Sequence, residues 1–239
     1  IFFLADKNFN FLTLPSFILF LTFILFSLNQ SLKKKDKIIS DYFLILTLFY
    51  FILKFTRISE FGVDLPSTIF SILGIYYFMK FYETKIEEEK KTYFFLISIF
   101  CVFSILIKLS SFPVIFFPLY IYIHNFNNFK FLIIKFKYFF IFLLFLIFFL
   151  QQFIFTGCIF FPNEFTCFNT SWFNSEYLNL SKQLELTNKS YYHKAKEIYS
   201  PDQYLVDLNW LNFWIKRNFI EISEHVLTIL MPSIIFILL

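Results

Sequence analysis

Residues 138–150 read YFFIFLLFLIFFL, and the only polar side-chain atom in this run is one tyrosine hydroxyl. Such a run predicts a helix that crosses a bilayer, because a span needs roughly 20 mostly apolar residues. The whole chain agrees: it is 58% hydrophobic and only 16% charged, whereas soluble proteins are about a quarter charged. We therefore expect an integral membrane protein.

Apolar stretches of similar character recur along the chain and are separated by short polar segments. They predict an all-α fold, a polytopic bundle of about seven transmembrane helices with a small α-helical segment on the outer face. Because the chain begins at Ile1 and ends within an apolar run, we expect it to be part of a longer protein. The expected spans are Phe11–Leu28, Ile38–Phe55, Ser67–Phe81, Tyr93–Ile107, Phe112–Ile123, Phe136–Phe155 and Ile222–Leu239. The domain plan is 1–155 for six helices, 156–221 for an extracytoplasmic loop and 222–239 for a truncated seventh helix.

Lysine and arginine are unevenly shared between alternate loops. Segments 33–37, 83–91 and 124–137, together with Lys80, carry eleven basic residues, whereas segments 57–67 and 108–112 carry two. Because basic residues mark cytoplasmic loops, the first set is expected in the cytoplasm and residues 156–221 outside. The lysines lie in short clusters between apolar runs, so the net charge of +4 does not indicate a nucleic-acid partner.

Two of the three cysteines, Cys158 and Cys167, follow directly after the sixth apolar run. On the outer side of a membrane they could form a disulfide, and Pro162 and Asn163 supply the turn between them. Two unpaired thiols are the alternative. Zinc is not favoured, because no CxxC or HxxxH spacing accompanies the pair.

Residues 203–219, QYLVDLNWLNFWIKRNF, predict an amphipathic helix on the bilayer surface. Tyr204, Leu208, Leu211 and Ile215 would share one stripe of this helix, and Trp210 and Trp214 would act as interfacial anchors. Packing of the same helix against the spans is an equally good interpretation.

Sequence motifs for nucleotide binding, zinc hydrolysis and serine hydrolysis are absent, and the chain has only three glycines. The strongest local candidate is RISEFGVDLPS, where Arg57, Glu60 and Asp64 share a short outer loop. Its carboxylates could bind a divalent metal ion or act as a base, and its arginine could hold a phosphate. The loop could equally be a polar connection with a helix cap at Asp64.

Three further ionisable residues lie near the ends of predicted spans. Lys108 could attract a lipid phosphate or extend to the interface, and Lys80 is expected to extend to the interface. Asp41 is expected at the inner boundary. No span carries an acid at its centre, so the usual sign of a proton or ion path is missing.

Several strings together resemble a known group. EFGVDLP, IKLSSFPVIFFPLYI, GCIFFPNEFTCFNTSWF and WLNFWIKRNF are similar to strings in bacterial polytopic inner-membrane proteins related to GT-C glycosyltransferases. This resemblance implies transfer of a sugar from a polyprenyl-phosphate donor to a glycan acceptor at the outer face, in cell-envelope glycan synthesis. The GT-C pattern places its catalytic acid in the first outer loop, which is expected upstream of Ile1. Glu60 and Asp64 would then be secondary acids for metal or donor-phosphate contact, beside Arg57 and Lys108.

Two other functions stay open from the sequence. An O-antigen polymerase or ligase would also have many spans and a large outer loop. Such proteins usually rely on outer arginines, and the outer loops here offer only Arg57 and Arg217. A transporter or a structural membrane protein is the other alternative. The lack of internal repeats, of glycine-broken helices and of charges at the middle of the spans disfavours the transporter.

Overall fold

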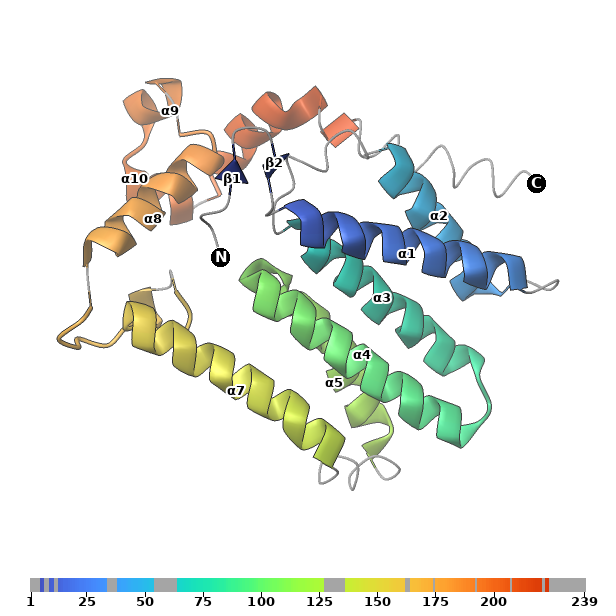
Figure 1. Ribbon diagram of the computed structural model, residues 1–239. Helices are drawn as coiled ribbons and strands as arrows, with labels where there is room; N and C mark the ends of the chain where they lie inside the picture. Colours follow the sequence, from blue (N-terminus) through green and yellow to red (C-terminus); the bar gives the residue numbers. More distant parts are fainter. Residues whose placement is uncertain are drawn as a thin grey trace. The chain divides into compact units, whose positions relative to one another are not determined.

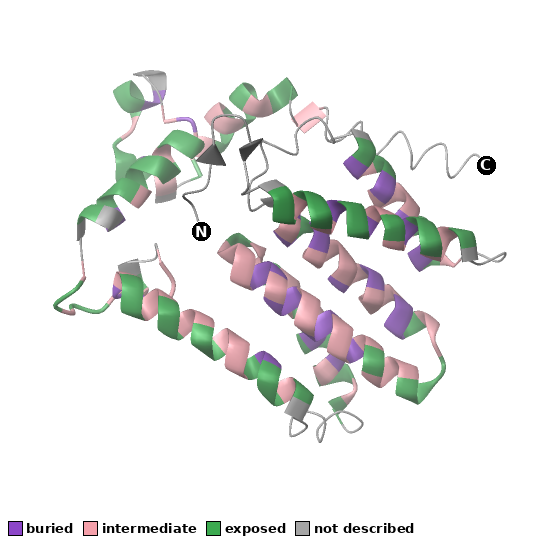
Figure 2. Ribbon diagram, viewed as in Figure 1, coloured by how far each residue is buried: buried purple, intermediate pink, exposed green. Residues whose placement is uncertain are grey.

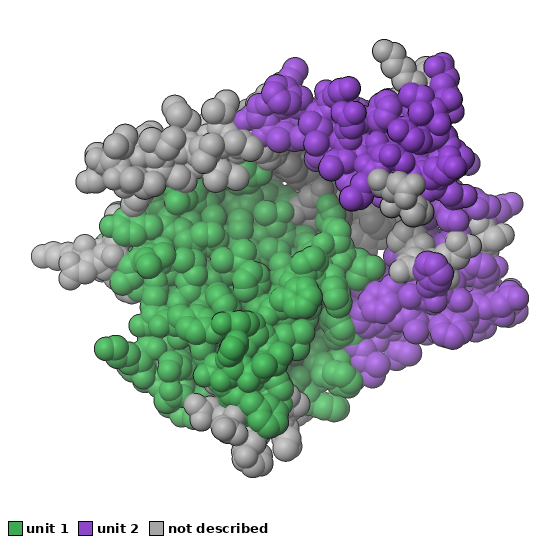
Figure 3. Space-filling model, turned by 180° about the vertical axis from the view of Figure 1, so that it is seen from behind, with its two compact units in different colours: residues 1–145 green, residues 146–239 purple. Residues whose placement is uncertain are grey.

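In the part of the chain that it describes, the computed structural model consists of helices and their connections, two strands of two residues and one isolated bridge between cysteines (Figure 1). It describes residues 5–6, 9–10, 13–33, 38–53, 64–126, 136–161, 164–173, 175–191, 193–206, 208–220 and 222–223. The chain divides into two compact units, residues 1–145 and 146–239, which Figure 3 colours separately. The boundary falls within a helix, ten residues before the domain boundary expected at 155.

The first unit begins with strands β1 (Ala5–Asp6) and β2 (Phe9–Asn10), which pair antiparallel with Ala5 opposite Asn10. Helices follow in chain order, and the antiparallel pair α3–α4 makes the most extensive contact in the unit. The helices are α1 (Thr13–Lys33), α2 (Ile39–Leu53), α3 (Asp64–Glu83), α4 (Glu87–Ile107), the 3₁₀ helix η2 (Leu109–Ile115), α5 (Phe116–His124) and α7 (Phe136–Thr156).

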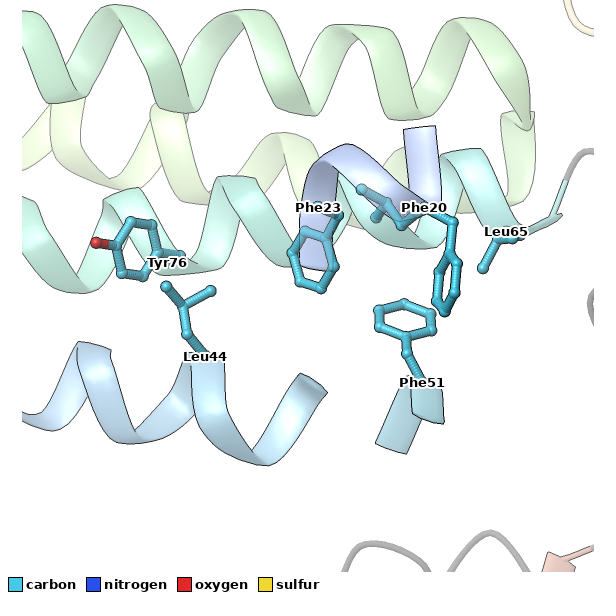
Figure 4. Packing of buried hydrophobic residues seen from close by; sticks show 7 residues of the cluster. Phe20, Phe23, Leu44, Phe51, Leu65 and Tyr76 are labelled. Carbon is cyan, nitrogen blue, oxygen red and sulfur yellow. The ribbon is translucent and has the colours of Figure 1, made fainter. Parts of the chain in front are cut away.

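Two buried clusters hold these helices together. Phe20 and Phe23 of α1 meet Phe51 of α2 edge to face, with ring centroids 6.0 and 5.4 Å apart (Figure 4). On the other side of α3, a second cluster joins Phe81 to Ile97 and Cys101 of α4 and to Ile121 of α5. Helix α3 is thus the central element of the first unit.

Close packing of α3 on α4 depends on a glycine. A Cβ placed on Gly74 would lie 3.1 Å from Sγ of Cys101, closer than ordinary packing allows. Small residues at such positions let two helix backbones approach, which is the usual way that helices associate in membranes.

Three of the described helices are long and apolar enough to cross a membrane: Leu14–Leu32, Glu87–Ile107 and Lys137–Thr156. The surfaces of two of these helices suit lipid rather than water, since α1 and α7 carry many exposed large apolar side chains (Figure 2). The prediction of helices able to cross a membrane is therefore confirmed for three of the described helices, fewer than the seven predicted spans.

Among the described residues, the remaining predicted spans do not form helices that are both long and apolar enough to cross a membrane, and the reason differs from one to the next. Helix α2 has 15 residues, about 22 Å of helix, against a hydrocarbon core of about 30 Å. Helix α3 is long enough but carries charged residues at its ends. The fifth span is divided into η2 and α5, where Pro113 and Pro118 remove backbone donors. Residues 224–239, nearly all of the seventh, lie outside the described residues.

The second unit contains the end of α7, a disulfide-closed hairpin and a group of short helices. The helices are η3 (Glu164–Thr166), α8 (Ser175–Asn188), α9 (His193–Ile198), α10 (Pro201–Val206) and the helical residues 210–220. The tyrosines Tyr191, Tyr199 and Tyr204 pack together with Phe213, at ring-centroid distances of 4.9 to 6.5 Å.

The single helix expected over 203–219 is wrong in one respect, because it is broken. Helix α10 ends at Val206, and Leu208 adopts a left-handed backbone with φ of 56° before residues 210–220 resume the helix. On a continuous helix Tyr204 and Phe213, nine positions apart, would lie on opposite faces. The break lets their rings pack 5.9 Å apart. Tyr204 is fully buried, whereas Leu208, Leu211 and Ile215 are exposed, so the predicted common stripe does not form.

Candidate functional site

A network of serine hydroxyls lies where α3 begins and α4 ends. Ser67 Oγ is 3.0 Å from Ser104 Oγ and 2.7 Å from Ser111 Oγ, and Ser71 Oγ is 2.7 Å from Ser104 Oγ. The Ser104 hydroxyl also donates to the carbonyl oxygen of Ser67 at 2.9 Å. Ser67 and Ser104 are buried, so these bonds satisfy polar groups that have left water. The network fixes the start of α3 against the end of α4 and η2.

This network brings two of the predicted site residues to one end of the first unit. Asp64 is the first residue of α3, three positions before Ser67. Lys108 separates α4 from η2 in an extended conformation, and its carbonyl accepts a hydrogen bond from the backbone N–H of Ser111 at 2.9 Å. The side chain of Lys108 is half-buried.

The other two predicted residues of this loop, Arg57 and Glu60, lie outside the described residues, and only the backbone of Asp64 is described. Within the part of the chain that the structure describes, no three His, Cys, Asp or Glu side chains are grouped so as to hold a metal ion. The divalent metal considered for Glu60 and Asp64 therefore stays a prediction.

A buried cluster of charges lies at the opposite end of α3. The Lys80 ammonium is 2.9 Å from Oδ1 of Asp41 and 3.6 Å from Oε2 of Glu83. Lys80 and Asp41 are both buried, since their side chains are 9% and 1% exposed. Glu83 also accepts hydrogen bonds from the backbone N–H and hydroxyl of Ser40, at 2.8 and 2.6 Å. The cluster therefore ties α2 to α3.

Sequence reasoning missed this cluster. Lys80 was expected to extend to the interface, but its ammonium turns inward to Asp41 and lies 5.4 Å from the ring centroid of Tyr76. Asp41 and Lys80 are 39 positions apart, so no local pattern links them. The available signal was an acid near the start of one apolar run and a lysine near the end of the next, which two consecutive antiparallel helices bring to the same side.

The disulfide pair and the tryptophan anchors lie in the second unit. Cys158 and Cys167 are joined by a disulfide and face each other in an antiparallel bridge. Trp210 and Trp214 contact each other edge to face, with centroids 6.2 Å apart. Trp210 also lies under the Lys189 ammonium, 5.0 Å from it, so this ring packs partly within its own unit.

Tyr204 is a fully buried titratable side chain of this unit. Its hydroxyl donates to the carbonyl oxygen of Lys189 at 2.8 Å. Burial raises the pKa of Tyr204 above its ordinary value, and the neighbouring Tyr191 raises it further. The neutral form of the Tyr204 phenol is therefore the one favoured in the folded unit.

Neither curated proteins nor solved structures provide a match to this chain. One family model does match, and it is described as a domain of unknown function, DUF8201. The match covers residues 1–239. The chain therefore belongs, over its whole length, to the DUF8201 family.

Proposed function

We propose that this protein is a multi-pass enzyme of the GT-C glycosyltransferase type, which takes a sugar from a polyprenyl-phosphate donor at the outer face of a bacterial inner membrane. The observation that carries the proposal is the Ser67–Ser111 hydrogen bond of 2.7 Å, which holds η2, the helix that begins directly after Lys108, against the first turn of α3. A cation beside the first turn of a helix favours a phosphate, because free backbone N–H groups there add positive potential.

The polar groups of α3 support a membrane-crossing orientation. Asp64 and Lys80 are sixteen positions apart, about 24 Å along a helix, which approaches the roughly 30 Å of a hydrocarbon core. The residues between them carry no charge. Pairing of Lys80 with Asp41 lowers the cost of holding both near the membrane, so α3 can be one of the seven spans that we propose.

The disulfide supports the proposed orientation. Structural disulfides persist in oxidising compartments and are rare in the cytosol. The bond between Cys158 and Cys167 is therefore best suited to the outer side, with residues 156–221 extracytoplasmic. The glycan acceptor and the polyprenyl-linked sugar would meet on this side, and the lipid chain of the donor would stay in the bilayer.

The alternative of an O-antigen polymerase or ligase gains no comparable support. Such an enzyme would need outer arginines directed to its substrate. Arg217, one of the two available, contacts the carbonyl oxygen of Thr187 at 3.5 Å within the second unit.

Binding of the donor phosphate can be tested without knowing the sugar. The full chain in nanodiscs of neutral lipid would be titrated with a fluorescent polyprenyl phosphate, with the matching polyprenol as the uncharged control. We expect Lys108→Met to weaken phosphate binding by about tenfold or more, since a charge-assisted hydrogen bond contributes roughly 1.5–3 kcal/mol. Lys90→Met, at an exposed ion pair of α4, is the matched control and should leave binding unchanged.

Equal affinity for polyprenyl phosphate and polyprenol would refute a phosphate site. The same conclusion would follow if Lys108→Met and Lys90→Met behaved alike.

A further inference from the structure

Exposed aromatic side chains gather around the point where α7 ends. Phe155, in the last turn of α7, is 73% exposed, and Phe165, in η3, is 100% exposed. Phe168 and Trp172 are each 51% exposed. Residues 157–173 contain a single charged residue, Glu164, and no lysine or arginine. Such a surface is costly in water, and the function proposed above does not use it.

The segment that carries these residues is a closed hairpin. The Cys158–Cys167 disulfide lies across it. Two backbone bonds frame the disulfide: Ile159 N–H donates to the carbonyl of Thr166 at 3.0 Å, and Phe168 N–H donates to that of Gly157 at 2.9 Å. Phe165 therefore lies, fully exposed, within a stretch that the disulfide and these two bonds close.

The base of the hairpin is attached to the last turns of α7. The indole N–H of Trp172 donates to the carbonyl oxygen of Phe153 at 3.3 Å. The rings of Phe168 and Trp172 both pack on the ring of Phe153, with centroids 5.6 and 6.1 Å away. Gly157 allows this return of the chain, because its φ of 75° is a conformation that favours glycine. The position of the hairpin is therefore tied to the position of α7.

The position of α7 in a membrane determines which part of the bilayer these aromatic residues would contact. Residues 137–156 form one of the helices that could cross a membrane, and it has the highest mean hydropathy of the three. A hairpin that starts at residue 157 must then lie at the level where the hydrocarbon core meets the headgroups. Tryptophan and other aromatic residues are enriched at this level, since their rings are apolar and the indole N–H is polar.

We propose that residues 157–173 form a disulfide-braced interfacial anchor, seated in the headgroup–acyl boundary of the bilayer with Phe165 at its tip and Trp172 at its base. Its partner is a bilayer surface of neutral, zwitterionic lipid, because the hairpin has no basic residue to prefer anionic headgroups. The proposal rests on the part of the proposed function that has α7 crossing the membrane. It does not depend on sugar transfer.

Fluorescence can locate the anchor, because the chain has only three tryptophans. The full chain carrying Trp210→Phe and Trp214→Phe keeps Trp172 as its single probe. In phosphatidylcholine vesicles, Trp172 should be quenched by lipids brominated close to the headgroup, more than by lipids brominated at the chain ends or by aqueous iodide. Phe165→Trp, made with all three native tryptophans replaced by Phe, should give the same pattern. Adding anionic lipid should change neither.

A third single-tryptophan variant separates the two proposals. Leu146→Trp, in the same tryptophan-free background, lies at the middle of the α7 span and should be quenched most by lipids brominated at the chain ends. If that result holds but Trp172 and the F165W probe respond only to iodide, the anchor is refuted while the span stands. If Leu146→Trp itself escapes lipid quenching, α7 does not cross, and both the anchor and the proposed topology are overturned.

Discussion

Replacing Lys80 by methionine should destabilise the first unit far more than the same change at an exposed lysine. The ammonium of Lys80 lies 2.9 Å from the Asp41 carboxylate, and both side chains are nearly excluded from water. Methionine has a similar length but leaves Asp41 as a buried charge without its cation. Removing one partner of a buried ion pair costs about 3–5 kcal/mol, which corresponds to a Tm decrease of roughly 6–20 °C in a chain of this size.

Lys90 provides the matched control within α4. Its ammonium is also 2.9 Å from a carboxylate, that of Glu87, but the two side chains are 26% and 54% exposed. An exposed pair contributes about 0.2–1 kcal/mol, so Lys90→Met should hardly change Tm. The comparison makes the same substitution at two lysines whose ammonium–carboxylate distances are equal, one in a buried pair between helices and one in an exposed pair within a helix.

The free thiol of Cys101 gives a direct assay. Cys101 is fully buried against α3, and the other two cysteines are in the disulfide. A thiol-reactive fluorogenic dye added to the detergent-solubilised protein therefore reports when the first unit opens during heating. The double variant Asp41→Asn with Lys80→Met should lose less stability than Lys80→Met alone, because the most deeply buried carboxylate, that of Asp41, is no longer left without its cation. Equal Tm values for Lys80→Met and Lys90→Met would show that the pair is not buried and would refute the reasoning.

Three further changes test the packing of each unit. Gly74→Leu should lower Tm, since overpacking costs about 1–3 kcal/mol, and adding Cys101→Ala should restore part of the loss in a circular-dichroism melt. Replacing Cys158 and Cys167 by serine should destabilise the second unit by about 2–3 kcal/mol, the loop-closure value for nine positions. Tryptophan emission during chemical unfolding measures this loss, and an unchanged unfolding midpoint would contradict the prediction. Tyr204 has a higher pKa in the folded protein than in the unfolded chain, where it is near 10. The contribution of the Tyr204 phenol to the free energy of unfolding is therefore complete below about pH 10 and is lost as the pH rises through the folded-state pKa. Tyr204→Phe should therefore be less sensitive than the parent protein to alkaline unfolding, and identical alkaline profiles would contradict this.

The sequence predicts helix positions well where apolar runs are long, and helix ends less well. The fourth predicted span began at Tyr93, but α4 begins at Glu87. Glu87, Glu88 and Glu89 looked like loop residues because they are charged. At the start of a helix they are favourable instead, since carboxylates interact well with the positive end of the helix dipole. Charge alone therefore does not mark the boundary between loop and helix.

The candidate site shows a similar division. The sequence singled out Asp64 and Lys108, and the pairing of Cys158 with Cys167 could be proposed because they are close in the chain and follow an apolar run. The serine network that brings the start of α3 to the end of α4 could not be proposed. Ser67 and Ser104 are 37 positions apart, and serines in apolar helices usually bond to their own backbone.

By itself the sequence determined that this chain is built from apolar helices, because composition and the length of apolar runs decide whether a segment suits a bilayer. The pairing of Asp41 with Lys80, the inward turn of Tyr204 and the brace of Trp172 on Phe153 were decided only by tertiary structure. Each depends on the rotation of one helix against another or on a break in a helix. A sequence pattern gives the faces of a helix but not which neighbour each face will meet.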